Sequence, residues 1–146
     1  MILGFKQFFS TGTPTFFEEK ILAGAGLMTP NILMGGGTKI HSMRGGNKWK
    51  PEMSIQMAYG VRTKQYRQFN KEIAELSVCK STQRVFMTCY DELAISVDGR
   101  RLGYTECDIL IQNDGLTHTQ FCNWFFPVNG IGKWEGKIIH WTDFKY

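Results

Sequence analysis

Several features that would point to a particular class of protein are missing from this sequence. No stretch of the 146 residues approaches about 18 consecutive apolar side chains, so no membrane-spanning helix is expected. The opening residues, MILGFKQFFSTG, carry neither a charged n-region nor a small-residue cleavage site, so no signal peptide is expected. There is also no internal repeat and no low-complexity tract. These absences favour a single domain over residues 1–146 that works in the cytoplasm.

Cysteine is sparse and scattered. The four cysteines are Cys79, Cys89, Cys107 and Cys122, and no two of them form a C-x-x-C pair. This spacing predicts neither a zinc site nor a disulfide framework. We therefore expect reduced thiols, no metal and no cofactor.

Positive charge is abundant in one segment. Residues 39–71 contain eight lysines and arginines against the single acid Glu52, a net charge of +7, whereas the whole chain carries only +4. Aromatic residues are interleaved with these cations, and basic charge attracts phosphates while aromatic faces stack bases. A solvated face above a few core aromatics would give the same pattern. The residues predicted to contact a nucleotide or RNA are Arg44, Lys48, Trp49, Lys50, Arg62 and Lys64.

Hydrophobic periodicity predicts an α+β fold. Helices are expected over residues 13–24, with Thr13 as the cap, over 105–115, with Thr105 as the cap, and over 117–126, where Thr117 and Gln120 have capping-box spacing. Between the first helix and residue 37, a glycine-rich loop over residues 25–36 is expected to contain a helical turn near 32–34.

Alternating apolar residues predict strands over residues 53–59 and 74–90, a hairpin around Asp98-Gly99, and a β-rich segment from Trp134 onward. In the 74–90 run the apolar face switches near residues 80–83, which indicates a bulge or bend of the kind that closes barrels. The architecture that follows has about five strands in a small barrel, with two or three short flanking helices.

The stretch GTKIHSMR, residues 37–44, concentrates reactive side chains. If it is a strand, Ser42 and Arg44 share one face, while Lys39 and His41 share the other. Lys39 and Ser42 can meet only if the chain turns between them, and the glycines just upstream permit a turn. A hydroxyl beside an amine that burial keeps neutral is a nucleophile–base arrangement. Lysine and serine three positions apart are also common without any such role, and His41 could simply face a polar rim.

GTKIHSMR resembles the G-x-K-x-x-[ST]-x-R motif of ASCH domains, which are PUA-like β-barrels related to an RNA-binding fold. Weaker resemblances lie in KIL-A-G before the motif, in KWKPEMSI, and in IQNDGLTHTQF, which is similar to the acidic segment of small bacterial N4-acetylcytidine amidohydrolases. The closing GKIIHWTDFKY is similar to that of small phage-related proteins with this pattern. The resemblance implies a PUA-like barrel in a bacterial or phage-infected cell, with the 25–36 loop as an insertion near the pocket.

The resemblance also implies a division of labour. Lys39 would act as general base, Ser42 as nucleophile on the acetyl carbonyl, and Asp114 as the carboxylate that handles the proton of the exocyclic nitrogen. Serine here replaces the family's threonine and aspartate replaces its glutamate. Arg44 would be structural or would bind the nucleotide. From local sequence alone, Asp114 before Gly115 could equally just close a helix.

Three functions remain open at this point. The first is an amidohydrolase of N4-acetylcytidine or a related modified nucleoside. The second is a module that binds a nucleotide or single-stranded RNA without turnover. The third is a phage accessory protein that presents a surface to a host protein. The oligomeric state is not predicted.

Overall fold

Two β-sheets, described by a computed structural model over residues 1–31, 34–35 and 37–146, build the fold. In the smaller sheet, β1 (Ile2–Phe5) runs parallel to β3 (Gln56–Tyr59), and β4 (Arg67–Gln68) is antiparallel to β3. The larger sheet is antiparallel in the order β2-β8-β5-β6-β7. Its strands are β2 (His41–Gly45), β5 (Ser81–Cys89), β6 (Leu93–Val97), β7 (Arg100–Arg101) and β8 (Gly132–His140).

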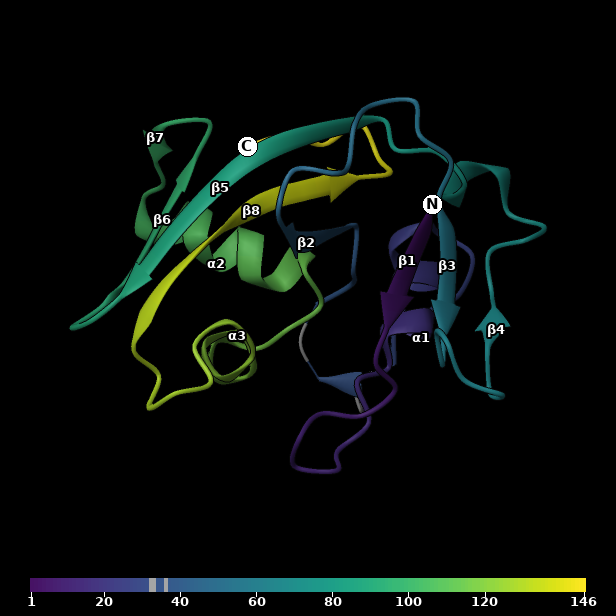
Figure 1. Ribbon diagram of the computed structural model, residues 1–146, viewed down its shortest axis with the longest axis horizontal. Coiled ribbons are helices and arrows are strands. Elements are labelled where there is room, and N and C mark those ends of the chain that lie inside the picture. The colour runs from purple at the N-terminus through teal and green to yellow at the C-terminus, as the bar shows by residue number, and fades with distance from the viewer. Residues whose placement is uncertain (32–33, 36) are drawn as a thin grey trace.

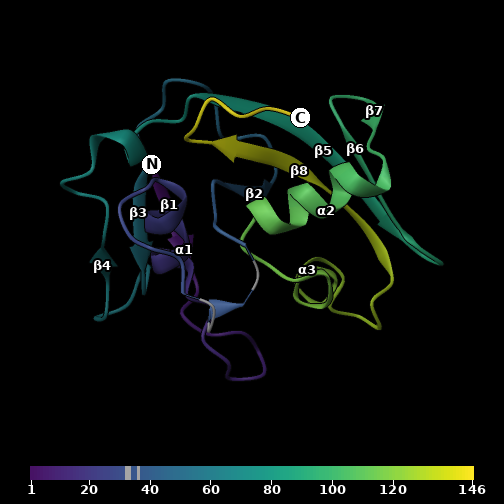
Figure 2. The ribbon, with the colours of Figure 1, turned by 180° about the vertical axis from the view of Figure 1, so that it is seen from behind.

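Helices α1 (Phe17–Gly24), α2 (Tyr104–Asn113) and α3 (His118–Phe125) and the 3₁₀ turn η2 (Ala74–Leu76) lie outside the two sheets. In both views α2 and α3 lie on the concave side of the curved β5–β8 pair, and α1 lies against β1 and β3 (Figure 1, Figure 2). No helix of the described residues is long and apolar enough to cross a membrane.

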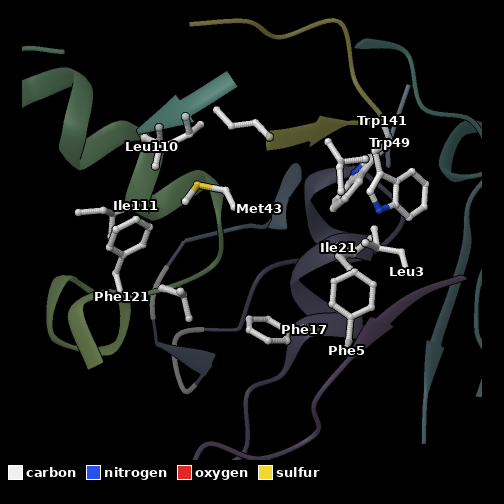
Figure 3. Close-up of a cluster of buried hydrophobic side chains, with 14 of the residues drawn as sticks. Leu3, Phe5, Phe17, Ile21, Met43, Trp49, Leu110, Ile111, Phe121 and Trp141 are labelled. Carbon is white, nitrogen blue, oxygen red and sulfur yellow. The ribbon is translucent and has the colours of Figure 1, made fainter. Parts of the chain in front are cut away.

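The core lies between two parts of the molecule, one formed by the larger sheet with α2 and α3 and the other by the smaller sheet with α1. Figure 3 shows side chains from α2 and α3 gathered on one side, side chains from β1 and α1 on the other, and Met43 of β2 between them. The apolar residues of the predicted strand alternate as expected, because Ile55, Met57 and Tyr59 are buried while Ser54 and Gln56 are exposed. Trp141 is also buried, whereas Trp124 and Trp134 are only half-buried.

The α+β class is confirmed, but the described strands do not form a closed barrel. On one side the sheets are joined by the bridge between Ser54 and Val78, where the chain bends before β5. On the other side no ladder joins the edge strands β1 and β2 within the described ranges; instead the Arg44 side chain of β2 donates a 2.5 Å hydrogen bond to the Gly4 carbonyl of β1. The β1 strand itself was not predicted, because four residues give too short a pattern.

Some predicted boundaries are wrong for local reasons. Thr13 does not cap α1: the helix begins at Phe17 after Phe16 in the left-handed region, and its first-turn Glu18 N–H donates to the Tyr59 hydroxyl at 2.8 Å. Of the 74–90 run, only Ser81–Cys89 is a strand. The Asp98-Gly99 hairpin is confirmed, with both residues at positive φ, as its tight turn requires. Of the turn expected near 32–34, residues 32–33 lie outside the described residues, whereas Met34 is described and its N–H donates to the Asn31 carbonyl at 3.0 Å.

The two threonines predicted as caps have different roles. Thr117 is the N-cap of α3, since its hydroxyl accepts from Gln120 N–H at 3.2 Å and the Gln120 side chain accepts from Thr117 N–H at 3.0 Å. Thr105 is instead an exposed residue in the first turn of α2, which begins after Gly103.

Replacing these threonines by alanine should therefore have opposite effects on stability. Thr117→Ala should lower the free energy of unfolding by about 1 kcal/mol, because a cap is lost. Thr105→Ala should leave it unchanged or raise it by a few tenths, about 0.5 kcal/mol at most, because alanine is the better helix former. Urea titration followed by circular dichroism measures both, and equal losses in the two variants would contradict this assignment of the caps.

Candidate active site

A cavity of about 610 Å³ lies where β1, α1, β2, α3 and the segment after β1 meet. Aromatic and polar side chains both line it, and its only charged residues among those described are Lys6, Lys39, Arg44 and Asp114. The aromatic side chains that line it are Phe5, Phe9, Phe17, Trp124, Phe125 and Trp134. Ser42 also lines this cavity, so the three residues predicted to carry catalysis, which are far apart in the chain, border one space.

The C-terminal end of α2 supplies the carboxylate. Asp114 is the C-cap of the helix, so the expectation that it closes the helix and the expectation that it lies in a site both describe the structure. The Lys39 ammonium donates to the Asp114 backbone carbonyl at 2.6 Å and to its carboxylate Oδ1 at 2.7 Å. A backbone bridge pairs the same two residues, and Ile40 N–H donates to Asn113 carbonyl at 2.9 Å. The shorter aspartate therefore reaches the lysine.

A second buried lysine reinforces this helix end. The Lys20 ammonium donates to the Gly115 carbonyl at 2.6 Å, and the Lys20 backbone carbonyl accepts from Lys39 N–H at 3.0 Å. Two ammonium groups thus face the carbonyls at the negative end of α2, where cations are favourable. Gly115 has φ +79°, and a Cβ there would lie 3.1 Å from Lys39 Cβ and 3.3 Å from Lys20 Cδ. A side chain at this position would crowd both lysines and strain a backbone conformation that favours glycine.

Ser42 and Arg44 share a face of β2, as alternation predicts. Arg44 Nη1 donates to Ser42 Oγ at 2.7 Å and to the Met43 carbonyl at 2.9 Å. No ion pair joins Arg44 to a carboxylate within the described ranges, so this half-buried guanidinium leaves positive charge facing the serine and the cavity. The direct bond expected between lysine and serine is not formed: no hydrogen bond of the described residues joins Lys39 Nζ to Ser42 Oγ.

Burial and charge shift the acid–base behaviour of the site. Burial lowers the pKa of Lys39, and the charge of Arg44 adds to this, although the neighbouring Asp114 opposes it. Burial alone would raise the pKa of Asp114, but Lys39 and His41 outweigh it, so that the pKa of the carboxyl lies below its usual range. Asp114 is thus ionised at neutral pH, and Lys39 loses its proton more easily than a surface lysine does.

A polar network that was not predicted lies behind Asp114. His41 is fully buried and does not face a polar rim; its Nδ1 is 3.6 Å from Asp114 Oδ1. His41 Nε2 is 2.7 Å from the Tyr146 hydroxyl, which also accepts from the Asn113 side chain at 3.0 Å. The pairing of β2 with β8 brings the end of the chain to the start of β2, and the bond from Ile40 N–H to Asn113 brings the end of α2 there. No local sequence signal indicates either contact.

The residues predicted to bind RNA come from segments on both sides of β3 in the chain. Lys48, Lys50, Arg62 and Lys64 are exposed; the first two precede that strand and the last two follow it. Trp49 is a correction: it is 6% exposed and packs in the core, so its ring is not available for stacking. Of this group, only Arg44 lines the cavity.

Three other expectations concern the surroundings of the site. The loop over residues 25–36 contributes none of its described residues to the cavity wall, so its expected place at the pocket is not observed. All four cysteines are free. Among the residues that the structure describes, no cluster of three histidine, cysteine or acidic side chains could hold a metal ion.

Comparison of the chain with protein-family models, with curated proteins and with solved structures gave no match. The ASCH-like character of GTKIHSMR therefore stays a prediction, and the site stands on its own geometry.

The buried Lys20 gives an unusual pH dependence of stability. Burial and the charge of Lys39 lower the pKa of Lys20 from 10.5 to about 8. Between these two pH values the unfolded chain binds the proton and the folded chain does not, so this group makes the free energy of unfolding rise with pH from about 8 to 10.5.

This rise can be isolated by difference, because Tyr59 and Tyr146, whose pKa values burial raises, act in the opposite direction. Lys20→Met should reduce the rise, leaving the part that the lowered pKa of Lys39 contributes in the same direction, whereas Lys71→Met, at an exposed lysine, should retain it in full. Urea titrations of the three proteins at pH values across this range provide the measurement. Identical pH profiles for the parent and Lys20→Met would show that Lys20 is not the buried amine described above.

Proposed function

We propose that this protein is an ASCH-type amidohydrolase that removes the acyl group from a modified nucleoside such as N4-acetylcytidine. The observation that carries the proposal is the convergence of Lys39, Ser42 and Asp114 on one aromatic-walled cavity, with Lys39 and Asp114 in contact across 75 positions of sequence. Aromatic walls suit a flat heterocycle, and a cavity of about 610 Å³ is within the range of small-molecule sites. Its substrate would be a nucleoside, or a nucleotide or RNA end that carries the same modified base.

The proposed reaction starts at Ser42. Its Oγ attacks the acetyl carbonyl carbon while its proton passes to the neutral amine of Lys39. The burial that lowers the pKa of Lys39 supports this role. The guanidinium of Arg44 is already bonded to Ser42 Oγ. It supplies positive charge beside the acetyl carbonyl oxygen, which becomes negative in the tetrahedral intermediate.

Collapse of the tetrahedral intermediate breaks the bond between the carbonyl carbon and the exocyclic nitrogen. The nitrogen takes the proton held by the Lys39–Asp114 pair and leaves as the free amine of cytidine. Water, deprotonated by the same pair, then attacks the acetyl-serine; the bond from the carbonyl carbon to Ser42 Oγ breaks, the pair returns the proton to Oγ, and acetate leaves. In this scheme Lys39 must exchange its partner, since in the structure its ammonium is bonded to Asp114 and not to Ser42.

The arrangement of the sheets is compatible with an opened PUA-like barrel. The Ser54–Val78 bridge joins the two sheets on one side, and the Arg44–Gly4 contact joins them on the other. The arginine of the G-x-K-x-x-[ST]-x-R motif, Arg44, would thus be needed by the fold itself. This contact supports the proposed family through the joining of the sheets and without resting on Lys39, Ser42 or Asp114.

Acetate release from N4-acetylcytidine tests the proposal. Lys39→Met and Ser42→Ala should each lower kcat by at least about 10³-fold, and the double variant should lose little more, because a nucleophile and its base act as one unit. Ser81→Ala is the matched control: Ser81 is buried, its hydroxyl has no hydrogen-bond partner in the described residues, and it does not line the cavity. This variant should keep full activity.

A calorimetric titration with the same nucleoside separates the remaining outcomes. Binding by the parent without acetate release would replace the enzyme by a nucleoside-binding module. If the parent neither binds the nucleoside nor releases acetate from it, the assignment of the cavity to this class of ligand is overturned.

A further inference from the structure

One buried nitrogen beside the site has no hydrogen-bond partner. His41 Nδ1 is buried and unpaired in the described residues, and the nearest carboxylate oxygen, Asp114 Oδ1, is 3.6 Å away. This separation exceeds an ordinary N–H···O bond of about 2.9 Å by less than about 1 Å. Since native structures leave few buried polar groups unpaired, an unpaired nitrogen that faces a site carboxylate calls for a functional reason.

The network around His41 favours one of its two neutral tautomers. The Tyr146 hydroxyl accepts from the Asn113 amide at 3.0 Å, so it can donate its own proton to His41 Nε2, 2.7 Å away. A neutral imidazole that accepts at Nε2 carries its hydrogen on Nδ1. The Nδ1–H therefore faces Asp114.

Burial favours this neutral form. Asp114 Oδ1 lies on its Nδ1 side, and the rings of His140 and Tyr146 lie 5.5 Å from it. Burial lowers the pKa of His41 despite the carboxylate of Asp114, so the ring stays neutral at physiological pH.

We propose that Asn113 and Tyr146 fix His41 as its Nδ1–H tautomer, and that His41 is a positioning residue that holds Asp114 when the Lys39 amine leaves it. In the structure Lys39 Nζ is bonded to Asp114 Oδ1 at 2.7 Å, and His41 Nδ1 lies 3.6 Å from the same oxygen without a bond to it. When Lys39 turns toward Ser42 or the substrate, a shift of less than about 1 Å brings His41 Nδ1–H into the vacated bond. The first part stands alone, whereas the second part rests on the proposed function.

The tautomer can be measured without any activity. In the ¹⁵N-labelled parent, long-range ¹H–¹⁵N correlation spectra should show His41 Nδ1 protonated and Nε2 unprotonated from about pH 5 to about pH 9. Asn113→Asp should reverse the assignment, because a carboxylate would take the Tyr146 proton and leave its oxygen to accept from Nε2–H. Asn129→Asp, at an exposed residue before β8, should leave the tautomer unchanged. An Nε2–H tautomer in the parent would overturn the inference.

Kinetics of two His41 variants test the positioning role. His41→Asn keeps an amide N–H near the place of Nδ1, whereas His41→Leu keeps the apolar volume and loses the donor. His41→Leu should lower kcat by about 10- to 100-fold with KM nearly unchanged, and His41→Asn by no more than about threefold. A merely structural role predicts the opposite order, because leucine suits a buried site better than asparagine, and that order would overturn the positioning role.

Failure of the proposed function gives a different result from failure of this inference. If the parent releases no acetate but His41 is the Nδ1–H tautomer, the hydrogen-bond network is confirmed and the amidohydrolase is not. The positioning role is then also wrong, because it rests on the proposed function. If the parent is active and the tautomer is Nε2–H, the amidohydrolase stands and the network is wrong.

Discussion

The contact between Lys39 and the end of α2 is the interaction on which the rest of the structure depends. An ammonium that is 2% exposed is stable in a protein interior only if its charge is compensated, and Asp114 compensates it through both its carboxylate and its carbonyl. The same contact fixes where β2 begins relative to α2. It therefore aligns Ser42 and Arg44 with the helix end and brings the two sheets to one cavity. Removing either partner alone would leave an unpaired charge inside the fold.

Excess positive charge is the second constraint. Lys20, Lys39 and Arg44 surround the site, and Asp114 is the one carboxylate that borders the cavity in the described ranges. Aromatic rings soften part of this imbalance, since Lys39 Nζ lies 4.7 Å from the centre of the Phe17 ring and the Arg44 guanidinium 5.4 Å from that of Phe5. The remaining field favours a ligand that is electron-rich or gains negative charge as it reacts, as an amide carbonyl does under attack.

Local chemistry made much of this fold predictable. The Asp98-Gly99 turn, the Thr117–Gln120 capping pair and the alternation around Met57 need no distant partner, and the structure contains all three. The start of α1 was not predictable, because Tyr59, 41 positions away, satisfies its first turn. The prediction that Trp49 is exposed was wrong for the same reason. Composition suggested a stacking residue, but packing between distant segments places Trp49 in the core. In the site, GTKIHSMR identified Lys39 and Ser42, but His41 and Tyr146 meet only through strand pairing.

The strands of the two sheets are held together unevenly. A ladder of nine residue pairs joins β5 to β8, whereas between β1 and β2 one hydrogen bond of the described residues, from Arg44 to Gly4, adds to the packing of Arg44 on Phe5. Gly4 and Arg44 both border the cavity. One arginine side chain therefore connects the junction of β1 and β2 to the candidate site: Arg44 bonds to Gly4 across it and to the Ser42 hydroxyl beside it, so a motion that parts β1 from β2 would also free that hydroxyl from Arg44.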